Sequence, residues 1–116
     1  MIASSDNDEA QDTIFPADYD EVISVGSYNK TGDNMQRKEN IDIYLPGENI
    51  VSTYSSRNDD RKYISCNGSS LSCAMFTGIA SLLIYDSYIQ NSKAFYSFFK
   101  NYGKINSFNE IILKLN

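Results

Sequence analysis

A serine at the start of an apolar helix is the feature of this sequence that could do chemistry. Residues 67–78 read N-G-S-S-L-S-C-A-M-F-T-G, so small and hydroxylated residues lead directly into an apolar run that reaches Tyr85. Asn67 and Ser69 are both good N-cap residues, and Gly68 permits a tight turn into the helix. A serine there lies beside unpaired backbone N–H groups and the positive end of the helix dipole, which can stabilise a developing oxyanion. From these residues alone, a capped core helix without catalytic function is the other interpretation.

Apolar residues lie on most sides of this predicted helix. The pattern therefore predicts a helix buried in a core and not one lying on a surface. Two stripes at helical spacing carry it, Leu71, Met75, Ile79 and Leu83 on one side and Phe76, Ala80 and Ile84 on the next.

Composition excludes several classes of function. The chain has 116 residues, enough for one small domain, and its net charge of −5 makes a nucleic-acid partner unexpected. No apolar run reaches the roughly 18 residues that a membrane span needs, and no signal peptide is recognisable, so we predict no location. Cys66 and Cys73 do not make a disulfide framework and are expected to be free thiols, with a bridge between them as the alternative. The chain has no histidine, which removes the commonest metal ligand and the commonest general base.

Short strands followed by helices are predicted for the rest of the chain. Residues 1–3 and 22–26 are typical of strands, and residues 41–54 predict a strand, a Pro-Gly turn and a second strand. Residues 93–102 place aromatic side chains at helical spacing. Residues 107–115 combine a capping box with an apolar stripe, so we expect two further helices near the C-terminus.

Four segments, in chain order, resemble those of the subtilases, the subtilisin-like serine endopeptidases of peptidase family S8. Residues 68–78 are similar to the nucleophile segment of that family, Gly-Thr-Ser-Met/Leu-Ala-Ala/Cys-Pro-x-x-x-Gly. The resemblance implies that Ser70 is the catalytic nucleophile. Residues 1–7 resemble the subtilase strand that ends in Ala-Ala-Gly-Asn, which implies that Asn7 is the oxyanion-hole amide.

Two more segments carry the resemblance through the middle of the chain. Residues 15–26 look like Tyr-Pro-Ala-x-Tyr-x-x-Val-Ile-x-Val-Gly, whose aromatic–proline pair borders the pocket for the side chain before the scissile bond. Phe15 and Pro16 are thereby implied as pocket wall, and packing of this turn against the core is the plain alternative. Residues 41–53 resemble Val-Asp-x-x-Ala-Pro-Gly-x-x-Ile-x-Ser-Thr, in which the carboxylate matching Asp42 helps some relatives to hold a weak cation. A lone carboxylate on a strand is more often solvated, so we expect no metal or other cofactor.

The match departs from the family pattern at three constrained positions. Asp6 replaces the usual Gly before the oxyanion Asn, Ser72 replaces Ala, and Ala74 replaces a nearly universal Pro. These substitutions fit relaxed pressure on the site, as in a non-catalytic truncated remnant or a pseudo-enzyme module that binds a partner. That interpretation is the alternative to an enzyme.

The resemblance implies an α/β fold, namely the C-terminal part of a parallel-sheet α/β/α subtilisin-like domain. Residues 1–116 would then be a partial peptidase S8 domain with a buried central helix from about Ser70 and two further C-terminal helices, lacking the Asp- and His-bearing N-terminal half. We therefore predict a serine endopeptidase part that cleaves peptide or protein substrates only when paired with that half, because no histidine is present to deprotonate Ser70. The short spacings and the Leu after the nucleophile are also seen in the lantibiotic leader peptidases. Intact relatives are mostly secreted or attached to the cell envelope.

Overall fold

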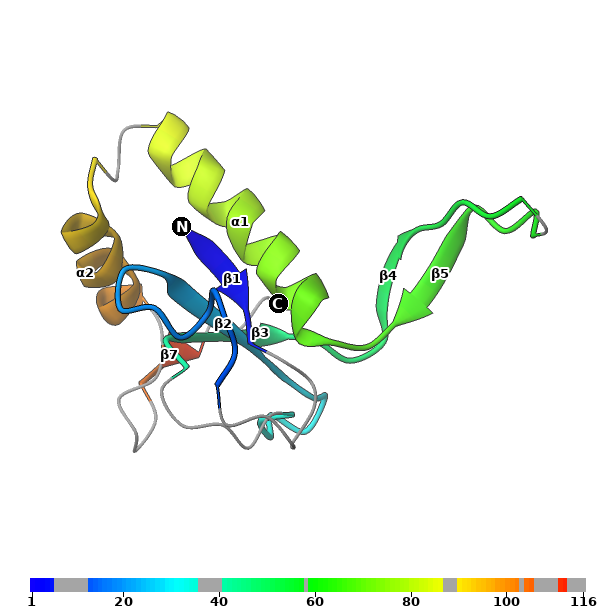
Figure 1. Ribbon diagram of the computed structural model, residues 1–116, viewed down its shortest axis with the longest axis horizontal. Coiled ribbons are helices and arrows are strands. Elements are labelled where there is room, and N and C mark those ends of the chain that lie inside the picture. The colour runs from blue at the N-terminus through cyan, green and yellow to red at the C-terminus, as the bar shows by residue number, and fades with distance from the viewer. Residues whose placement is uncertain are drawn as a thin grey trace.

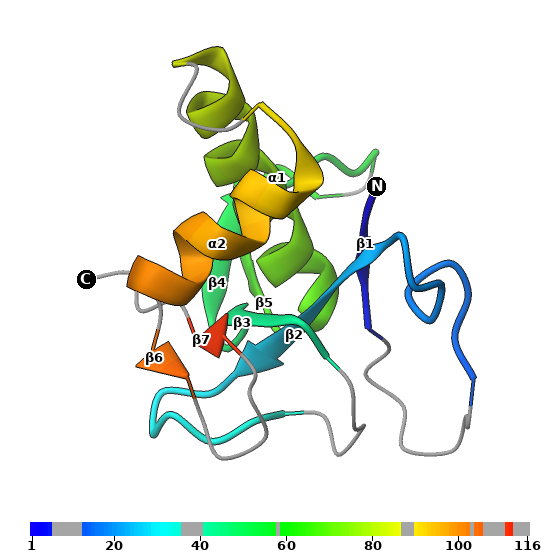
Figure 2. The ribbon, with the colours of Figure 1, turned by 90° about the vertical axis from the view of Figure 1, so that its left-hand side faces the viewer.

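A mostly parallel sheet with two helices on one of its faces forms the body of the protein in this computed structural model (Figures 1 and 2). The structure describes residues 1–5, 13–35, 41–57, 59–86, 90–102, 104–105 and 111–112. Of the three layers that an α/β/α arrangement implies, the described residues form two, the sheet and one layer of helices. The predicted α/β class is confirmed.

Five strands form the sheet in the order β1-β2-β3-β7-β6. The strands predicted near residues 1–3, 22–26 and 41–46 are confirmed. Because β1, β2 and β3 pair in parallel, their carboxyl ends meet at one edge of the sheet. The parallel strands are β1 (Ile2–Ser4), β2 (Ile23–Tyr28), β3 (Ile43–Pro46) and β7 (Ile111–Ile112), and β6 (Lys104–Ile105) runs antiparallel to β7.

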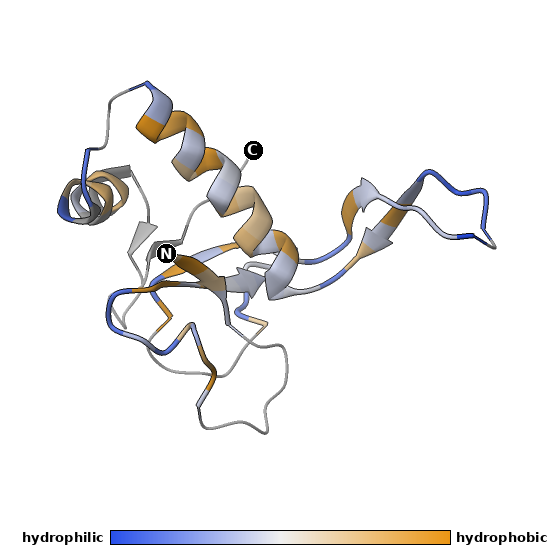
Figure 3. Ribbon diagram, turned by 45° about the horizontal axis from the view of Figure 1, so that its top comes forward, coloured by the Kyte–Doolittle hydropathy of each residue, from blue (hydrophilic) through white to orange (hydrophobic). Residues whose placement is uncertain are grey.

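A separate hairpin extends away from the sheet (Figure 1). Its strands are β4 (Ile50–Thr53) and β5 (Tyr63–Cys66), which pair in antiparallel fashion. The tip between them is hydrophilic in Figure 3, as the polar composition of residues 55–62 predicts. β5 leads directly into helix α1 (Ser69–Tyr85), so this hairpin joins the end of β3 to the start of that helix.

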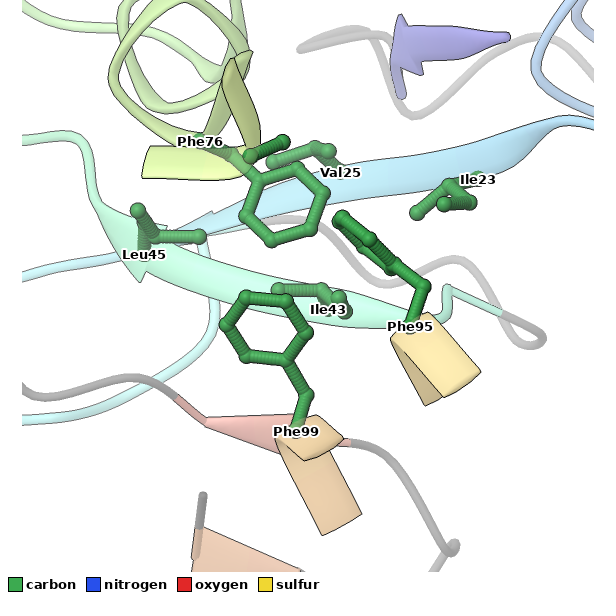
Figure 4. Close-up of a cluster of buried hydrophobic side chains, with 8 residues drawn as sticks. Ile23, Val25, Ile43, Leu45, Phe76, Phe95 and Phe99 are labelled. Carbon is green, nitrogen blue, oxygen red and sulfur yellow. The ribbon is translucent and has the colours of Figure 1, made fainter. Parts of the chain in front are cut away.

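The core lies between the sheet and the two helices (Figure 4). Phe76 of α1 is completely buried and contacts two rings of α2 (Ser92–Tyr102), with centroid distances of 5.4 Å to Phe95 and 5.2 Å to Phe99. Apolar side chains of the sheet complete this core, namely Ile23, Val25, Ile43 and Leu45. The aromatic face predicted for residues 93–102 is therefore what holds α2 on the sheet.

Burial of α1 is narrower than the sequence predicts. Its buried residues form one stripe, Ser69, Ser72, Phe76 and Ala80, whereas Leu82, Ile84 and Tyr85 are exposed. The prediction of a helix buried on most sides is wrong in the described part of the chain, because only one face of α1 meets the sheet. Apolar residues recur around the whole helix, and their pattern does not reveal which of them are covered.

The second predicted C-terminal helix is also wrong where the structure describes it. Ile111 and Ile112 form β7, which pairs in parallel with Ile43 and Tyr44 of β3. β-branched residues fit a strand well, and the edge of β3 offers backbone groups that need partners. This long-range pairing overrides the local capping box. No helix in the described ranges has the length and hydropathy needed to cross a membrane.

Truncation of the central aromatic ring tests this account of the core. Phe76→Ala should lower the free energy of unfolding by about 3–5 kcal/mol, because it leaves a cavity under α2. Leu82→Ala is the matched control on the same helix; since Leu82 is 67% exposed, its change should stay within about 0.5 kcal/mol. Urea denaturation followed by circular dichroism measures both, and equal losses would contradict the assignment of the core.

Candidate active site

The first turn of α1 lies at the sheet edge where the parallel strands end (Figure 1). The buried hydroxyl of Ser69 donates a hydrogen bond to the backbone carbonyl of Ser5, the residue that follows β1. The N–H of Gly68 donates to the carbonyl of Gly47, just after β3, at 2.8 Å. Ligands of parallel α/β sheets bind at the carboxyl ends of the strands, so this edge is the candidate site.

Gly68 makes the turn into the helix. It is the N-cap residue of α1 with φ 145° and ψ 157°, a backbone conformation that residues with a side chain rarely adopt. The predicted side-chain caps are wrong, because α1 has no side-chain cap hydrogen bond. Ser69 is instead the first helical residue, and the Asn67 side chain accepts a hydrogen bond from the N–H of Asn49 at 2.7 Å.

Ser70 is the second residue of α1 and is exposed to solvent. Its hydroxyl makes no hydrogen bond to any residue that the structure describes, so it is available to a ligand. Position in the first turn leaves the Ser70 N–H without an intrahelical carbonyl, at the positive end of the helix dipole. No acidic residue in the first turn offsets that positive end. The geometry suits a nucleophile whose own N–H helps to stabilise an oxyanion.

Phe15 and Pro16 lie on an exposed turn and are joined by a cis peptide bond. The Phe15 side chain is 61% exposed and stacks on the ring of Tyr19, with centroids 4.6 Å apart. Ala17, the next residue, is the part of the turn that is buried against Ala3 of β1. The aromatic–proline pair itself is thus available to a ligand, and packing of Phe15 against the core is not observed.

Asn7, the predicted oxyanion-hole residue, lies outside the described residues. The nearest described residue before it is Ser5, whose carbonyl is bound by the Ser69 hydroxyl. The end of β1 is therefore bonded to the turn that carries Ser70.

Comparison with known families agrees with this geometry. The sequence model of the subtilase family matches residues 1–94. This chain belongs to the subtilase family. At the level of the family it is therefore a serine peptidase. No curated protein matches the chain in sequence.

Two of the departures from the subtilase pattern have a structural context. Ser72 is completely buried, and its hydroxyl donates to the carbonyl of Pro46 at 2.8 Å and lies 3.3 Å from that of Leu45. Ala74 lies on the exposed side of α1. The third, Asp6, is outside the described residues. Sequence reasoning missed the contacts of Ser69 and Ser72, although two hydroxyls three residues apart on one helix face were a usable signal.

The Asp42 carboxylate is hydrogen-bonded within the fold. One of its carboxylate oxygens accepts hydrogen bonds from both the N–H and the hydroxyl of Ser24, each at 2.9 Å. Within the described ranges no group of three or more acidic, cysteine or histidine side chains could hold a metal ion. Cys66 and Cys73 are both free thiols, and burial raises the pKa of the Cys73 thiol.

Gly47 allows the close approach of α1 to β3 in this subtilase. A Cβ atom placed on Gly47 would lie 2.2 Å from the Cβ of Ser27 and 2.9 Å from the hydroxyl oxygen of Ser72. Both neighbours are fully buried and have no space to yield. Any side chain at Gly47 would therefore clash both with Ser27 of β2 and with Ser72 in the first turn of α1.

Replacement of this glycine tests the close approach. Gly47→Ala should lower the free energy of unfolding by about 1–3 kcal/mol through overpacking. Gly78→Ala is the matched control: a Cβ on Gly78 meets no atom within 4 Å, and alanine in a helix should raise stability by about 0.5–1 kcal/mol. Thermal unfolding of the two variants measures the sign of each change in stability. A Gly47→Ala variant with unchanged stability would show that the first turn of α1 can move to make room for a side chain.

Proposed function

We propose that this chain is the nucleophile-bearing part of a subtilase catalytic domain and cleaves peptide bonds by acyl transfer. The observation that carries the proposal is the position of Ser70, exposed in the first turn of a helix whose start is bonded to the ends of β1 and β3. A hydroxyl there can reach a bound carbonyl while the N–H of the same residue faces the oxygen that becomes negative.

The proposed oxyanion hole consists of the Ser70 N–H and the side-chain amide of Asn7. An amide NH2 is a neutral donor at any working pH. Asn7 follows Ser5 by two residues, a chain length that spans at most about 7 Å. Since the Ser5 carbonyl is bonded to Ser69, this short separation along the chain supports the proposal that Asn7 serves the same site as Ser70.

The proton acceptor has to come from another polypeptide segment, because the sequence contains no histidine. A serine hydroxyl is a weak nucleophile until a base removes its proton. Lys62 is exposed on the hairpin, where nothing removes it from water and adapts it to act as a base. We therefore propose that an Asp- and His-bearing half pairs with this chain and that the chain alone is inactive.

Phe15 and Pro16 are proposed as one wall of the pocket for the substrate side chain that precedes the scissile bond. Their exposure supports this role, because an aromatic ring held on a turn and open to solvent can pack against a peptide side chain. The substrate class is a peptide or protein.

A non-catalytic remnant or binding module is the competing interpretation of the departures at Asp6, Ser72 and Ala74. Relaxed pressure would be expected to leave a substituted polar group poorly accommodated in a buried site. Ser72 is instead fully buried and hydrogen-bonded. This observation favours the enzyme part.

Labelling with a fluorophosphonate tests the role of Ser70. The full chain mixed with a separately expressed Asp- and His-bearing half of a subtilase domain should be phosphonylated at Ser70, as peptide mapping by mass spectrometry would show. The chain alone should react far more slowly, because loss of the base costs about 10⁶ in turnover in a subtilisin, where this was measured.

Two variants make the labelling test specific. Ser70→Ala should abolish labelling, whereas Ser81→Ala, which alters an exposed serine of the same helix, should leave it unchanged. Labelling of the chain alone at the rate of an intact protease would refute its inactivity. Labelling that persists in Ser70→Ala would refute Ser70 as the nucleophile.

Removal of the side-chain amide tests the proposed oxyanion hole. Asn7→Ala in the same mixture should lower kcat for a peptide substrate while KM changes little, because the amide acts on charge that develops only in the transition state. The loss known for such a donor in a subtilisin is about 10²–10³. An unchanged kcat would remove Asn7 from the site.

A further inference from the structure

Ser72, like Ser69, donates its hydrogen bond out of α1, unlike Thr77 and Ser81 further along the helix. Thr77 and Ser81 donate back along the helix to the carbonyls four residues earlier, those of Cys73 and Thr77, each at 2.8 Å. Ser72 instead donates out of the helix to the end of β3, where the carbonyl of Pro46 is 2.8 Å away. A serine has one hydroxyl proton, so Pro46 is the main acceptor and the carbonyl of Leu45, at 3.3 Å, is secondary.

Ser70 therefore lies between two residues at the start of α1 that bond to adjacent residues, Pro46 and Gly47. Two residues before Ser70, the Gly68 N–H bonds to the carbonyl of Gly47 at 2.8 Å. Two residues after it, the Ser72 hydroxyl bonds to Pro46. Since Pro46 and Gly47 are adjacent, both bonds connect the first turn of α1 to one short segment at the end of β3.

The second attachment depends on a hydroxyl group. The subtilase pattern has Ala at the position of Ser72, and a methyl group donates no hydrogen bond. Ser72 is fully buried, so the lost bond cannot be replaced by water without opening the contact between α1 and β3. The first attachment uses a backbone N–H, which every residue but proline has.

We infer that Ser72 is a positioning residue, which holds the first turn of α1 against Pro46 and so sets the position of Ser70 relative to the strand ends. This inference rests on the proposed role of Ser70 as the nucleophile. Without the Ser72 bond, this turn would be held through Gly68 and Ser69 alone, and both of these attachments precede Ser70.

Amide hydrogen exchange in the full chain tests the attachment itself. Ser72→Ala should raise exchange about tenfold at residues 71–73, since one buried hydrogen bond of ordinary strength is lost. Exchange at residues 79–83 of the same helix should stay unchanged. The matched control is Ser81→Ala, which removes the same atom from α1 but only a bond within the helix.

Phosphonylation kinetics in the mixture with the Asp- and His-bearing half test whether the attachment positions Ser70. Saturation with the fluorophosphonate separates the affinity for the probe, the first-order rate of phosphonylation and the final labelled fraction. Ser72→Ala should lower the first-order rate about tenfold and leave the labelled fraction intact. Irreversible unfolding alone would lower the labelled fraction without altering the rate of the molecules that remain folded.

Each outcome bears on the inference in a defined way. Uniformly faster exchange along α1, or exchange unchanged at residues 71–73, would overturn it. Faster local exchange with an unchanged first-order rate would also overturn it, because the turn would then be anchored without effect on Ser70. A wild-type mixture that shows no phosphonylation would refute the proposed function. The hydrogen-exchange experiment would still decide whether Ser72 anchors the turn.

Discussion

Contact between the first turn of α1 and the carboxyl ends of β1 and β3 is the constraint on which the rest of this structure depends. Gly47 permits it because it has no side chain: a Cβ there would lie 2.9 Å from the hydroxyl oxygen of Ser72 on α1. The approach brings the hydroxyls of Ser69 and Ser72 within hydrogen-bonding range of backbone carbonyls that belong to different strands. Polar side chains can be buried at this junction because each has an acceptor.

The first turn of α1, which makes this contact, and the rest of the helix have different structural roles. Beyond the first turn, the helix contributes Phe76 and Ala80 to the apolar core under α2, so its far part supplies burial energy. Its first turn has small polar residues and supplies the exposed hydroxyl of Ser70, whose own N–H has no intrahelical carbonyl. A rigid core behind a polar turn is the arrangement that an acyl-transfer nucleophile needs, because its geometry must not relax during the reaction.

The uncovered surfaces follow from the same arrangement. One side of α1 meets the sheet, which leaves Leu82, Ile84 and Tyr85 exposed on the helix. The hairpin of β4 and β5 extends from the junction (Figure 1). Its Val51 and Tyr63 side chains are exposed. Apolar exposure of this kind is compatible with the proposed pairing of this chain with an Asp- and His-bearing half.

Sequence by itself determined the local elements of this protein. Alternating and apolar runs predicted β1, β2, β3 and β4, because side-chain period and turn residues act over a few positions. The motif around Ser70 predicted the helix start and the family, and the motifs that named Asn7, Phe15 and Pro16 predicted a site that is still a proposal.

Only the tertiary structure decided which surfaces are covered and which groups are paired. In the sequence, Ser72 is a departure from the subtilase motif. Its hydrogen-bond acceptor, the carbonyl of Pro46, lies 26 residues earlier in the chain, on β3. A capping box predicted a helix over residues 107–115, yet Ile111 and Ile112 pair with a strand nearly 70 residues earlier. The physical reason is the same in both cases: local patterns encode backbone preference and apolar content, whereas hydrogen-bond partners and burial depend on segments that are close only after folding.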